Sequence, residues 1–246
     1  MRKKTKKLAV QSLESRDLMA ADLLPNGELL IETGNGNDNI EIHVETSYSF
    51  AQVNTGKLGR WGSSFVSIPL LTSEVVYTNR SGRFITEQAR FDADDVTQIR
   101  VRANGGHDTV TNNTGLRSYI YGGSGNDVLN GGSNIDYIYG SYGNDTIRGK
   151  AGSDRLYGQS NNDVLEGGSG TDYLYGSTGN DTIRGGSGGD RIYGSSGNDN
   201  LYGQTGNDYI YGGSGDDGLF GGSGVDFLQG SSGDDRFLVN SESGFW

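Results

Sequence analysis

The stretch "GSGNDVLNGGSNIDYIYGSYGND", residues 123–145, places an aspartate at every ninth position. Asp127, Asp136 and Asp145 each follow a glycine-rich turn and precede a short apolar step. Carboxylates that are brought close together repel one another and disfavour joint ionisation. A fold that stacks these residues therefore needs a compensating positive charge.

The nine-residue interval continues through the second half of the chain without a miss. A glycine stands five residues before each aspartate, and an apolar residue stands two residues after it. The residue two positions before it is Gly, or Asn at 134 and 161, and Asn is the non-glycine residue most tolerant of positive φ. The thirteen aspartates are Asp127, Asp136, Asp145, Asp154, Asp163, Asp172, Asp181, Asp190, Asp199, Asp208, Asp217, Asp226 and Asp235.

Each nonapeptide reads as a six-residue turn followed by a three-residue strand with one apolar side chain, too short to bury that side chain alone. Stacked coils solve this, because each Leu or Ile then packs on its equivalents. With two turns per coil, residues 18 apart become neighbours. Thirteen units leave at most 11 gaps between stacked turns. A divalent hard cation such as Ca²⁺, held by carboxylates and carbonyls, would reverse the repulsion in those gaps.

The unit 122–130, Gly-Gly-Ser-Gly-Asn-Asp-Val-Leu-Asn, resembles the RTX, or hemolysin-type, calcium-binding repeat. The units that begin at Gly167, Gly185, Gly212 and Gly221 match the same pattern. The resemblance implies an all-β fold, a right-handed parallel β-roll, with Ca²⁺ between turns. Its ligands would be the thirteen aspartates and turn carbonyls.

Some turns depart from the repeat pattern. The turns 131–135 and 158–162 are the weakest matches, so Asp136 and Asp163 are the least secure candidate ligands. The isolated motifs that end at Asp38 and Asp108 lie out of the 18-residue register. We expect those two to be structural turns without in-register partners.

Composition narrows the function. Only 32% of the 246 residues are hydrophobic, 43 are glycine and none is cysteine, so no disulfide or thiolate site can form. The net charge of −11 lies entirely in residues 118–246, since residues 1–117 carry 14 acidic and 14 basic residues. An acidic surface repels nucleic acid and anionic lipid and attracts cations. No apolar stretch approaches the roughly 18 residues of a membrane span.

Four segments are expected along the chain. Residues 1–21 form a targeting or disordered segment, and residues 13–20 resemble the LEPR-XLL motif at the start of many exported or surface bacterial proteins, with Ser15 and Met19 as departures. Residues 22–117 alternate in a β pattern and are predicted to be a β-meander that caps the stack. Residues 118–240 form the roll, and residues 241–246 form a tail.

No catalytic constellation is evident. The stretch 185–189 formally matches the G-x-S-x-G nucleophile elbow, but it is a repeat turn with no helix after it. No H-E-x-x-H motif occurs, so a zinc protease is not represented. The sequence therefore predicts a non-enzymatic, secreted or cell-surface calcium-binding structural protein. The alternatives are a folding and secretion module of a secreted enzyme, or a carbohydrate-binding adhesin module.

One outward face of the predicted roll carries aromatic and basic residues at 18-residue intervals. Three interpretations stay open: cross-strand aromatic stacking, a contact face for a glycan or a surface protein, and a surface covered by the N-terminal meander. The candidate contact residues are Tyr139, Tyr157, Tyr175, Tyr193, Tyr211, Arg155 and Arg191.

Overall fold

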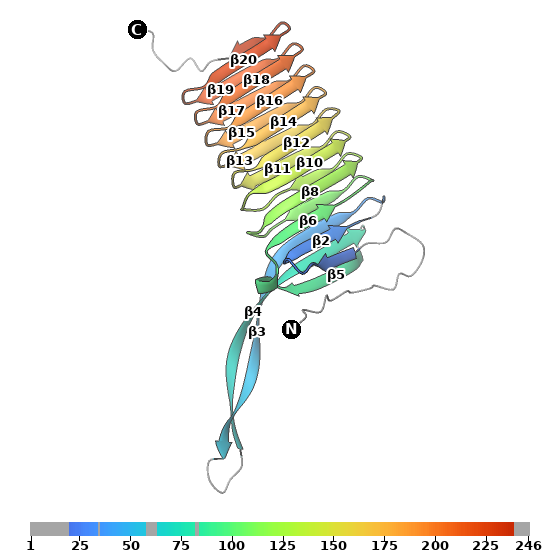
Figure 1. Cartoon of the computed structure of the whole chain (residues 1–246), viewed down its shortest axis with the longest axis vertical. Coiled ribbons are helices and arrows are strands. Elements are labelled where there is room, and N and C mark those ends of the chain that lie inside the picture. The colour runs from blue at the N-terminus through green and yellow to red at the C-terminus, as the bar shows by residue number, and fades with distance from the viewer. Residues whose placement is uncertain (1–19, 34, 58–62, 82–83, 239–246) are drawn as a thin grey trace.

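The computed structural model describes residues 20–33, 35–57, 63–81 and 84–238, and for residues 20–21, 43–57, 63–81 and 84–93 it describes the backbone alone. The motif at residues 13–20 therefore lies almost wholly outside the described residues. Nearly all of the described chain is strand, arranged as a long stack of two sheets (Figure 1). The predicted parallel β-roll is confirmed.

The two sheets divide the strands alternately. The first sheet contains, in spatial order, β1 (Ala20–Leu23), β2 (Glu28–Glu32), β6 (Gln98–Arg102), β8 (Arg117–Ser124), β10 (Asp136–Tyr142), β12 (Arg155–Ser160), β14 (Tyr173–Thr178), β16 (Arg191–Ser196), β18 (Tyr209–Ser214) and β20 (Phe227–Ser232). The second contains β21 (Arg236–Leu238), β19 (Gly218–Ser223), β17 (Asn200–Thr205), β15 (Thr182–Ser187), β13 (Val164–Ser169), β11 (Thr146–Ala151), β9 (Val128–Asn130), β7 (Thr109–Asn112), β3 (Asn39–Lys57), β4 (Ser63–Ser81) and β5 (Phe84–Asp92).

Strands 18 residues apart pair in parallel and in register. Leu156 in β12 lies opposite Leu174 in β14, and Ile183 in β15 lies opposite Leu201 in β17. These strands have six residues rather than the three expected, because the pairing continues past the apolar step into the start of the next turn. The predicted stacking interval is correct, and the hydrogen-bonded ladder is longer than the repeat pattern indicated.

The core consists of two columns of apolar side chains between the sheets, one column from each sheet. From Leu129 to Leu219 each repeat strand contributes one Leu or Ile that is fully buried. Burying such a side chain contributes about 1.5–3 kcal/mol, and stacking allows strands of this length to form a core. At the C-terminal end the core is exposed to solvent, since Phe237 is 49% exposed and no described strand lies beyond β21.

The parallel pairing extends N-terminal of the nonapeptide repeats. Strand β2 pairs in parallel with β6, β6 with β8, and the start of β3 with β7. The antiparallel part consists of β1 on β2 and of the ribbon β3–β4–β5, which leads into the 3₁₀ turn Ala93–Asp95. Part of the predicted meander is therefore a continuation of the roll, and its long β3–β4 hairpin projects from that end (Figure 1).

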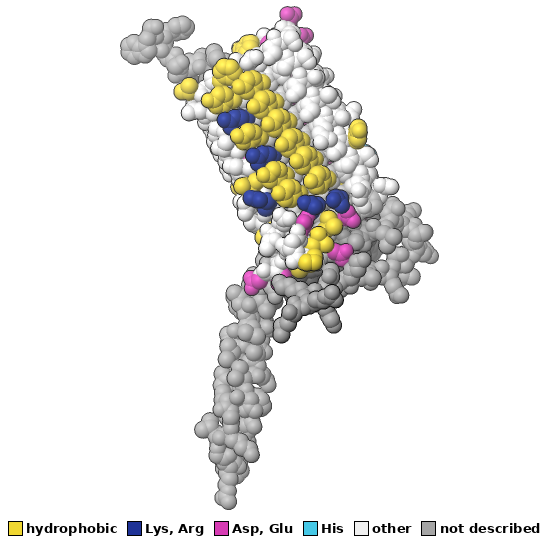
Figure 2. All heavy atoms as spheres, in the orientation of Figure 1, with side chains coloured by type: hydrophobic (Ala, Val, Ile, Leu, Met, Phe, Trp, Pro, Cys, Tyr) yellow, Lys and Arg dark blue, Asp and Glu magenta, His cyan; other side chains and the backbone are white. Residues whose placement is uncertain are grey.

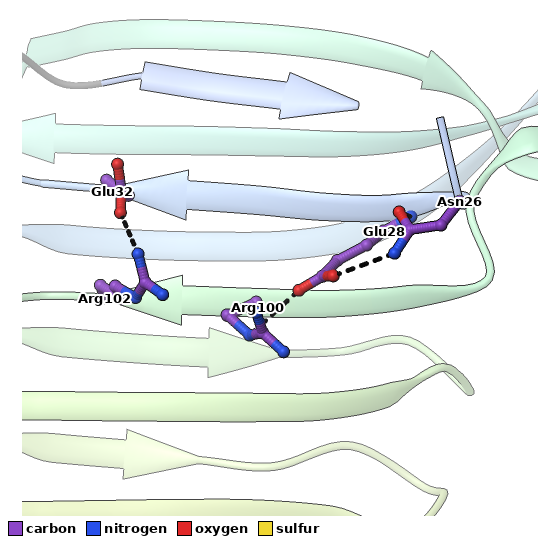
Figure 3. A network of polar contacts seen from close by, with 5 residues as sticks. All are labelled: Asn26, Glu28, Glu32, Arg100 and Arg102. Atoms are coloured by element: carbon purple, nitrogen blue, oxygen red, sulfur yellow. Dashed lines mark hydrogen bonds and ion pairs between the residues drawn. The ribbon is translucent and has the colours of Figure 1, made fainter. Parts of the chain in front are cut away.

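Ion pairs across β2 and β6 link the first coils (Figure 3). Arg102 pairs with Glu32 on the neighbouring strand, and Arg100 Nε lies 3.0 Å from Glu28 Oε1, without the alignment of a hydrogen bond. Glu28 also lies beside Asn26, whose backbone turn precedes β2. In the Glu28 pair the carboxylate is buried and the Arg100 side chain is 31% exposed, so this pair is less screened by solvent than the more exposed Arg102–Glu32 pair.

Candidate metal sites in the turns

The thirteen aspartates of the repeats, called here the ladder aspartates, line two columns of turns. One column holds Asp127 and every second ladder aspartate after it, and the other holds Asp136 and its equivalents. Except in the turn before Asp136, each turn reverses the chain with positive φ at its second and fourth positions, as at Ser177 (φ 87°) and Gly179 (φ 132°). L side chains disfavour this region, so the fourth position is Gly or Asn, although the second position also accepts Lys150, Gln159 and Gln204.

Each ladder aspartate connects two coils. The backbone N–H of Asp163 donates to Asp181 Oδ1 at 2.8 Å, and the N–H of Asp181 donates to Asp199 Oδ1 at 2.8 Å. The same bond recurs in both columns, up to the bonds accepted by Asp226 and Asp235 at 3.0 and 3.1 Å. Each of these aspartates therefore uses Oδ1 to accept the backbone N–H of the preceding aspartate in its column.

The second carboxylate oxygen, Oδ2, is buried and has no hydrogen-bond partner at most of these positions. Leaving a buried acceptor unsatisfied costs about 1–3 kcal/mol, and more when the group is charged. A column of such atoms points to a missing positive partner. The ladder aspartates concerned are Asp127, Asp145, Asp154, Asp163, Asp172, Asp181, Asp190, Asp199, Asp208 and Asp217, and Asp108, one coil before Asp127, shares the feature.

The glycine five residues before each ladder aspartate, called here the first-position glycine, leaves the space beside that oxygen open. A Cβ on Gly185 would overlap Asp190 Oδ2 and would lie 2.8 Å from the carbonyl oxygen of Gly203 in the next turn of the column. The same convergence occurs at Gly167, where the carbonyl belongs to Gly185. A carboxylate oxygen and a carbonyl oxygen thus meet beside an absent side chain, which is the ligand chemistry that Ca²⁺ prefers.

Burial makes the ladder carboxylates reluctant to ionise. Loss of solvent, followed by repulsion from the neighbouring aspartates of the column, raises the pKa of Asp154 and of Asp163 to about 8 from an ordinary 3.8. The same causes raise the pKa of Asp190 and of Asp199 to about 7. A bound divalent cation would reverse this penalty, because it stabilises the ionised form.

The ligand set is not a cluster of side chains. Within the described ranges, no three His, Cys, Asp or Glu side chains come together to hold a metal ion. Each gap between turns offers carboxylates from successive ladder aspartates, and the remaining ligands of a six- to eight-oxygen shell would be backbone carbonyls or water. The residues present fit calcium and do not fit a zinc site, which takes Cys or His ligands.

Asp136 differs from the other ladder aspartates. Its Oδ1 accepts bonds from the N–H and the hydroxyl of Ser118 at 2.9 and 2.6 Å, and its Oδ2 accepts the N–H of Gly132 at 2.6 Å. Protein groups therefore satisfy both oxygens. Asp163, the other weak candidate from the sequence, has the same unpartnered Oδ2 as the regular positions.

The prediction that Asp38 and Asp108 lack in-register partners is wrong. The N–H of Asp108 donates to Asp127 Oδ1 at 2.8 Å, and the N–H of Asp38 donates to Asp108 Oδ1 at 2.6 Å. The extra residue between Asp108 and Asp127 lies in the longer turn that joins β7 to β8, so the register of this column is kept. Sequence spacing alone could not show where the insertion is absorbed.

A second ladder, of asparagines, was not recognised from the sequence. The N–H of Asn144 donates to Asn126 Oδ1 at 2.9 Å, and the N–H of Asn180 donates to Asn162 Oδ1 at 2.7 Å. His107 Nδ1 accepts the N–H of Asn126 and so continues this ladder toward the N-terminus. The available signal was the Gly-Asn-Asp triplet, whose Asn recurs every 18 residues beside the Asp.

The predicted Tyr/Arg face exists on the first sheet (Figure 2). The rings of the Tyr121 to Tyr211 column stack nearly parallel, with centroids 4.7–5.0 Å apart. In the neighbouring column the Arg155 guanidinium lies 5.2 Å from the ring centroids of both Tyr137 and Tyr173. The β3–β5 ribbon joins the other sheet, so it does not cover this face as one interpretation supposed.

Stacking limits what this face can present. Because each inner ring of the Tyr121 to Tyr211 column lies between two others, its edge and hydroxyl face outward while its flat sides are covered. Arg155 and Arg191 donate to the hydroxyls of Tyr137 and Tyr173 at 2.9 and 2.7 Å. Such a row stabilises the sheet through cross-strand pairs and offers hydroxyl and guanidinium groups at its surface.

Two parallel sheets joined by glycine-rich turns, with aspartate columns inside those turns, define a calcium-binding β-solenoid. Comparison with protein-family models agrees: the model of the RTX calcium-binding nonapeptide repeat matches several overlapping segments that together span residues 117–240. The chain belongs to this family. No curated protein matches the chain. Among the described residues, no helix is long and apolar enough to cross a membrane.

Proposed function

We propose that this protein is a secreted or cell-surface structural protein whose roll folds when Ca²⁺ binds between stacked turns. The columns of buried, unpartnered carboxylate oxygens beside first-position glycines carry the proposal. Without a cation, the folded roll must either hold protons on these aspartates or bury their charge, and both disfavour folding near neutral pH.

Binding and folding are coupled in this proposal because the site does not exist in the extended chain. The two oxygens beside a first-position glycine come from residues of successive coils, such as Asp190 and Gly203. Free energy of calcium binding therefore appears as free energy of folding. With thirteen ladder aspartates, the gaps between turns could take at most 11 ions.

The expected affinity supports action outside the cell. Extracellular calcium modules bind with dissociation constants of about 10⁻⁴–10⁻³ M, so a chain of this kind would stay unfolded in a low-calcium cytosol and fold after export. The net charge of −11 would also keep the unfolded chain extended. Export is part of the proposal, as is the absence of catalytic activity.

A calcium titration of the full chain tests the coupling. Starting in chelator at pH 7.5, far-ultraviolet circular dichroism and hydrodynamic radius should report β-structure and compaction at the same calcium concentration. Mg²⁺ at equal concentration should be far less effective, because it demands a smaller, more regular shell. A compact, β-rich chain in excess chelator would overturn the proposal.

A second candidate role, adhesion to a polysaccharide, rests on the continuous Tyr/Arg face. Its hydroxyl and guanidinium groups recur at about one strand spacing along the roll, a regular array that suits a repeating glycan. A triple Tyr157→Ser, Tyr175→Ser, Tyr193→Ser variant should still bind calcium and fold but lose retention on insoluble polysaccharide. Tyr142→Ser, at a 69% exposed tyrosine outside the column, is the control. Unchanged retention of the folded triple variant would leave only the stacking role.

A further inference from the structure

The first coils of the roll lack the first-position glycine of the repeats. The turn after Ala103 keeps positive φ at its second and fourth positions, Asn104 and Gly106, whereas the turn after Asn112 does not. Strand pairing places Ala103 level with Gly122, and Asn112 level with Gly131. Thr33 stands level with Ala103 one coil earlier, since its N–H bonds to the carbonyl of Arg102. All three side chains are buried. A side chain therefore stands where each repeat turn has none.

These side chains take up the space and the polar contacts that the repeats leave open. The Thr33 hydroxyl donates at 2.7 Å to the carbonyl of Ala103, the counterpart of the carbonyl that converges on a repeat site. Asn112 Oδ1 accepts the N–H and the hydroxyl of Thr114 at 2.9 and 2.7 Å. The methyl group of Ala103 occupies the position that corresponds, one coil later, to a Cβ on Gly122, and such a Cβ would overlap the carboxylate of Asp127.

A lysine supplies positive charge at the same end. Lys150 occupies the second position of its turn, and its ammonium group donates to the Asn112 carbonyl at 3.0 Å and to Asn113 Oδ1 at 3.3 Å. These residues line an open surface pocket together with Gly132. The Asn112 carbonyl and Asn113 Oδ1 could otherwise face a metal ion, but both already bind the Lys150 ammonium group. The neighbouring turn contains Asp136, whose two carboxylate oxygens are both hydrogen-bonded.

We propose that the side chain at the first position decides which turns take calcium, and that the coils containing Thr33, Ala103 and Asn112 form a calcium-independent end on which the calcium-dependent repeats assemble. This inference rests on the proposed function, because it divides the turns into two classes of calcium response. Asp136 joins the calcium-independent end for a separate reason: its first position is a glycine, Gly131, but both of its carboxylate oxygens are already hydrogen-bonded by protein groups.

Hydrogen exchange on the full chain tests the division. In chelator at neutral pH, the amides of β6 and β7 should stay protected while those of β14 and β15 exchange rapidly, and added calcium should protect all four. Equal exchange of both pairs of strands in chelator would overturn the inference. If all four exchange rapidly and calcium later protects them, the proposed function stands alone; if all four are protected, it fails as well.

A gain of a calcium site tests the role of the first position. Ala103→Gly would open the space between Asp108, whose Oδ2 is buried and unpartnered, and the carbonyl of Gly122. Native mass spectrometry in calcium should then count one more ion than in the parent. Ala151→Gly, at the third position of a repeat turn, makes the same chemical change away from that space and should leave the count unchanged.

The outcomes are separable. If the parent binds several ions and the Ala103→Gly variant binds the same number, the first-position rule is wrong but calcium binding by the repeats stands. A parent that binds none would overturn the proposed function itself. Gly176→Ala gives an independent check, since its Cβ would overlap Asp181 Oδ2, and its count should fall below that of the parent.

Discussion

At the scale of single residues, an aspartate and a glycine five positions apart act as one unit. Asp181 uses Oδ1 to hold the turn before it and leaves Oδ2 beside Gly176, where the carbonyl of Gly194 also approaches. The sequence predicted that the aspartates face one another across stacked turns. It could not predict that one oxygen of each would be taken up by a backbone N–H, because that depends on side-chain geometry.

Loss of an aspartate should matter more inside a column than at its end. Asp181 accepts a bond from Asp163 and donates to Asp199, whereas Asp235 ends its column among the described residues. Asp181→Asn should therefore raise the calcium midpoint of folding about tenfold or more, and Asp235→Asn should raise it less. Equal shifts in paired calcium titrations would argue against shared sites between successive turns.

The pH response of the calcium-free chain follows from the raised pKa values. Ladder aspartates with a folded-state pKa of about 6–8 and an ordinary value of 3.8 bind more protons when the roll is folded. The stability of the calcium-free roll should therefore fall as pH rises from about 4 to 8. In chelator, acidification from pH 8 to 5 should increase β-structure measured by circular dichroism.

Calcium should reverse that dependence, because protons and Ca²⁺ compete for the same carboxylates. The calcium midpoint should be lower at pH 8 than at pH 5.5, measured in otherwise identical buffers. A midpoint that does not change with pH would mean that the ladder aspartates are not the groups that bind the ion.

At the scale of elements, the repeat strands were predictable and the first strands were not. One apolar residue per nonapeptide determines which residue of each strand points inward, and the fully buried row that includes Leu156 and Ile183 agrees with that pattern. The parallel pairing of β2 with β6 was missed because the hairpin of β3 and β4 separates them in sequence. Sequence periodicity does not reveal such an insertion.

The tyrosine column should contribute to the stability of the first sheet. Tyr175 stacks on Tyr157 and Tyr193 with centroids 5.0 and 4.8 Å away. Tyr175→Ser should reduce the free energy of unfolding in saturating calcium by about 0.5–1 kcal/mol per lost pair. Tyr142→Ser should change it little, and equal losses in chemical denaturation would contradict a specific contribution from stacking.

At the scale of the whole molecule, the negative net charge and the solenoid architecture both follow from the nonapeptide repeats. A chain with a net charge of −11 and 32% hydrophobic residues has too little apolar surface for a conventional globular core. The roll needs only one buried apolar residue per strand, and its acidic columns provide sites for cations. The class of fold and the identity of the metal could therefore be predicted from the repeats, while the proposal of a calcium-independent end depends on which residues the stacked coils bring level with one another.

The most direct test of this account is the number of calcium ions bound, counted by native mass spectrometry along a titration in which β-structure is measured on the same samples. The account predicts several ions, no more than 11 in the parent chain, with binding and β-structure rising at the same calcium concentration. A fully β-structured chain with no bound calcium at neutral pH, or calcium bound without any gain in structure, would contradict it.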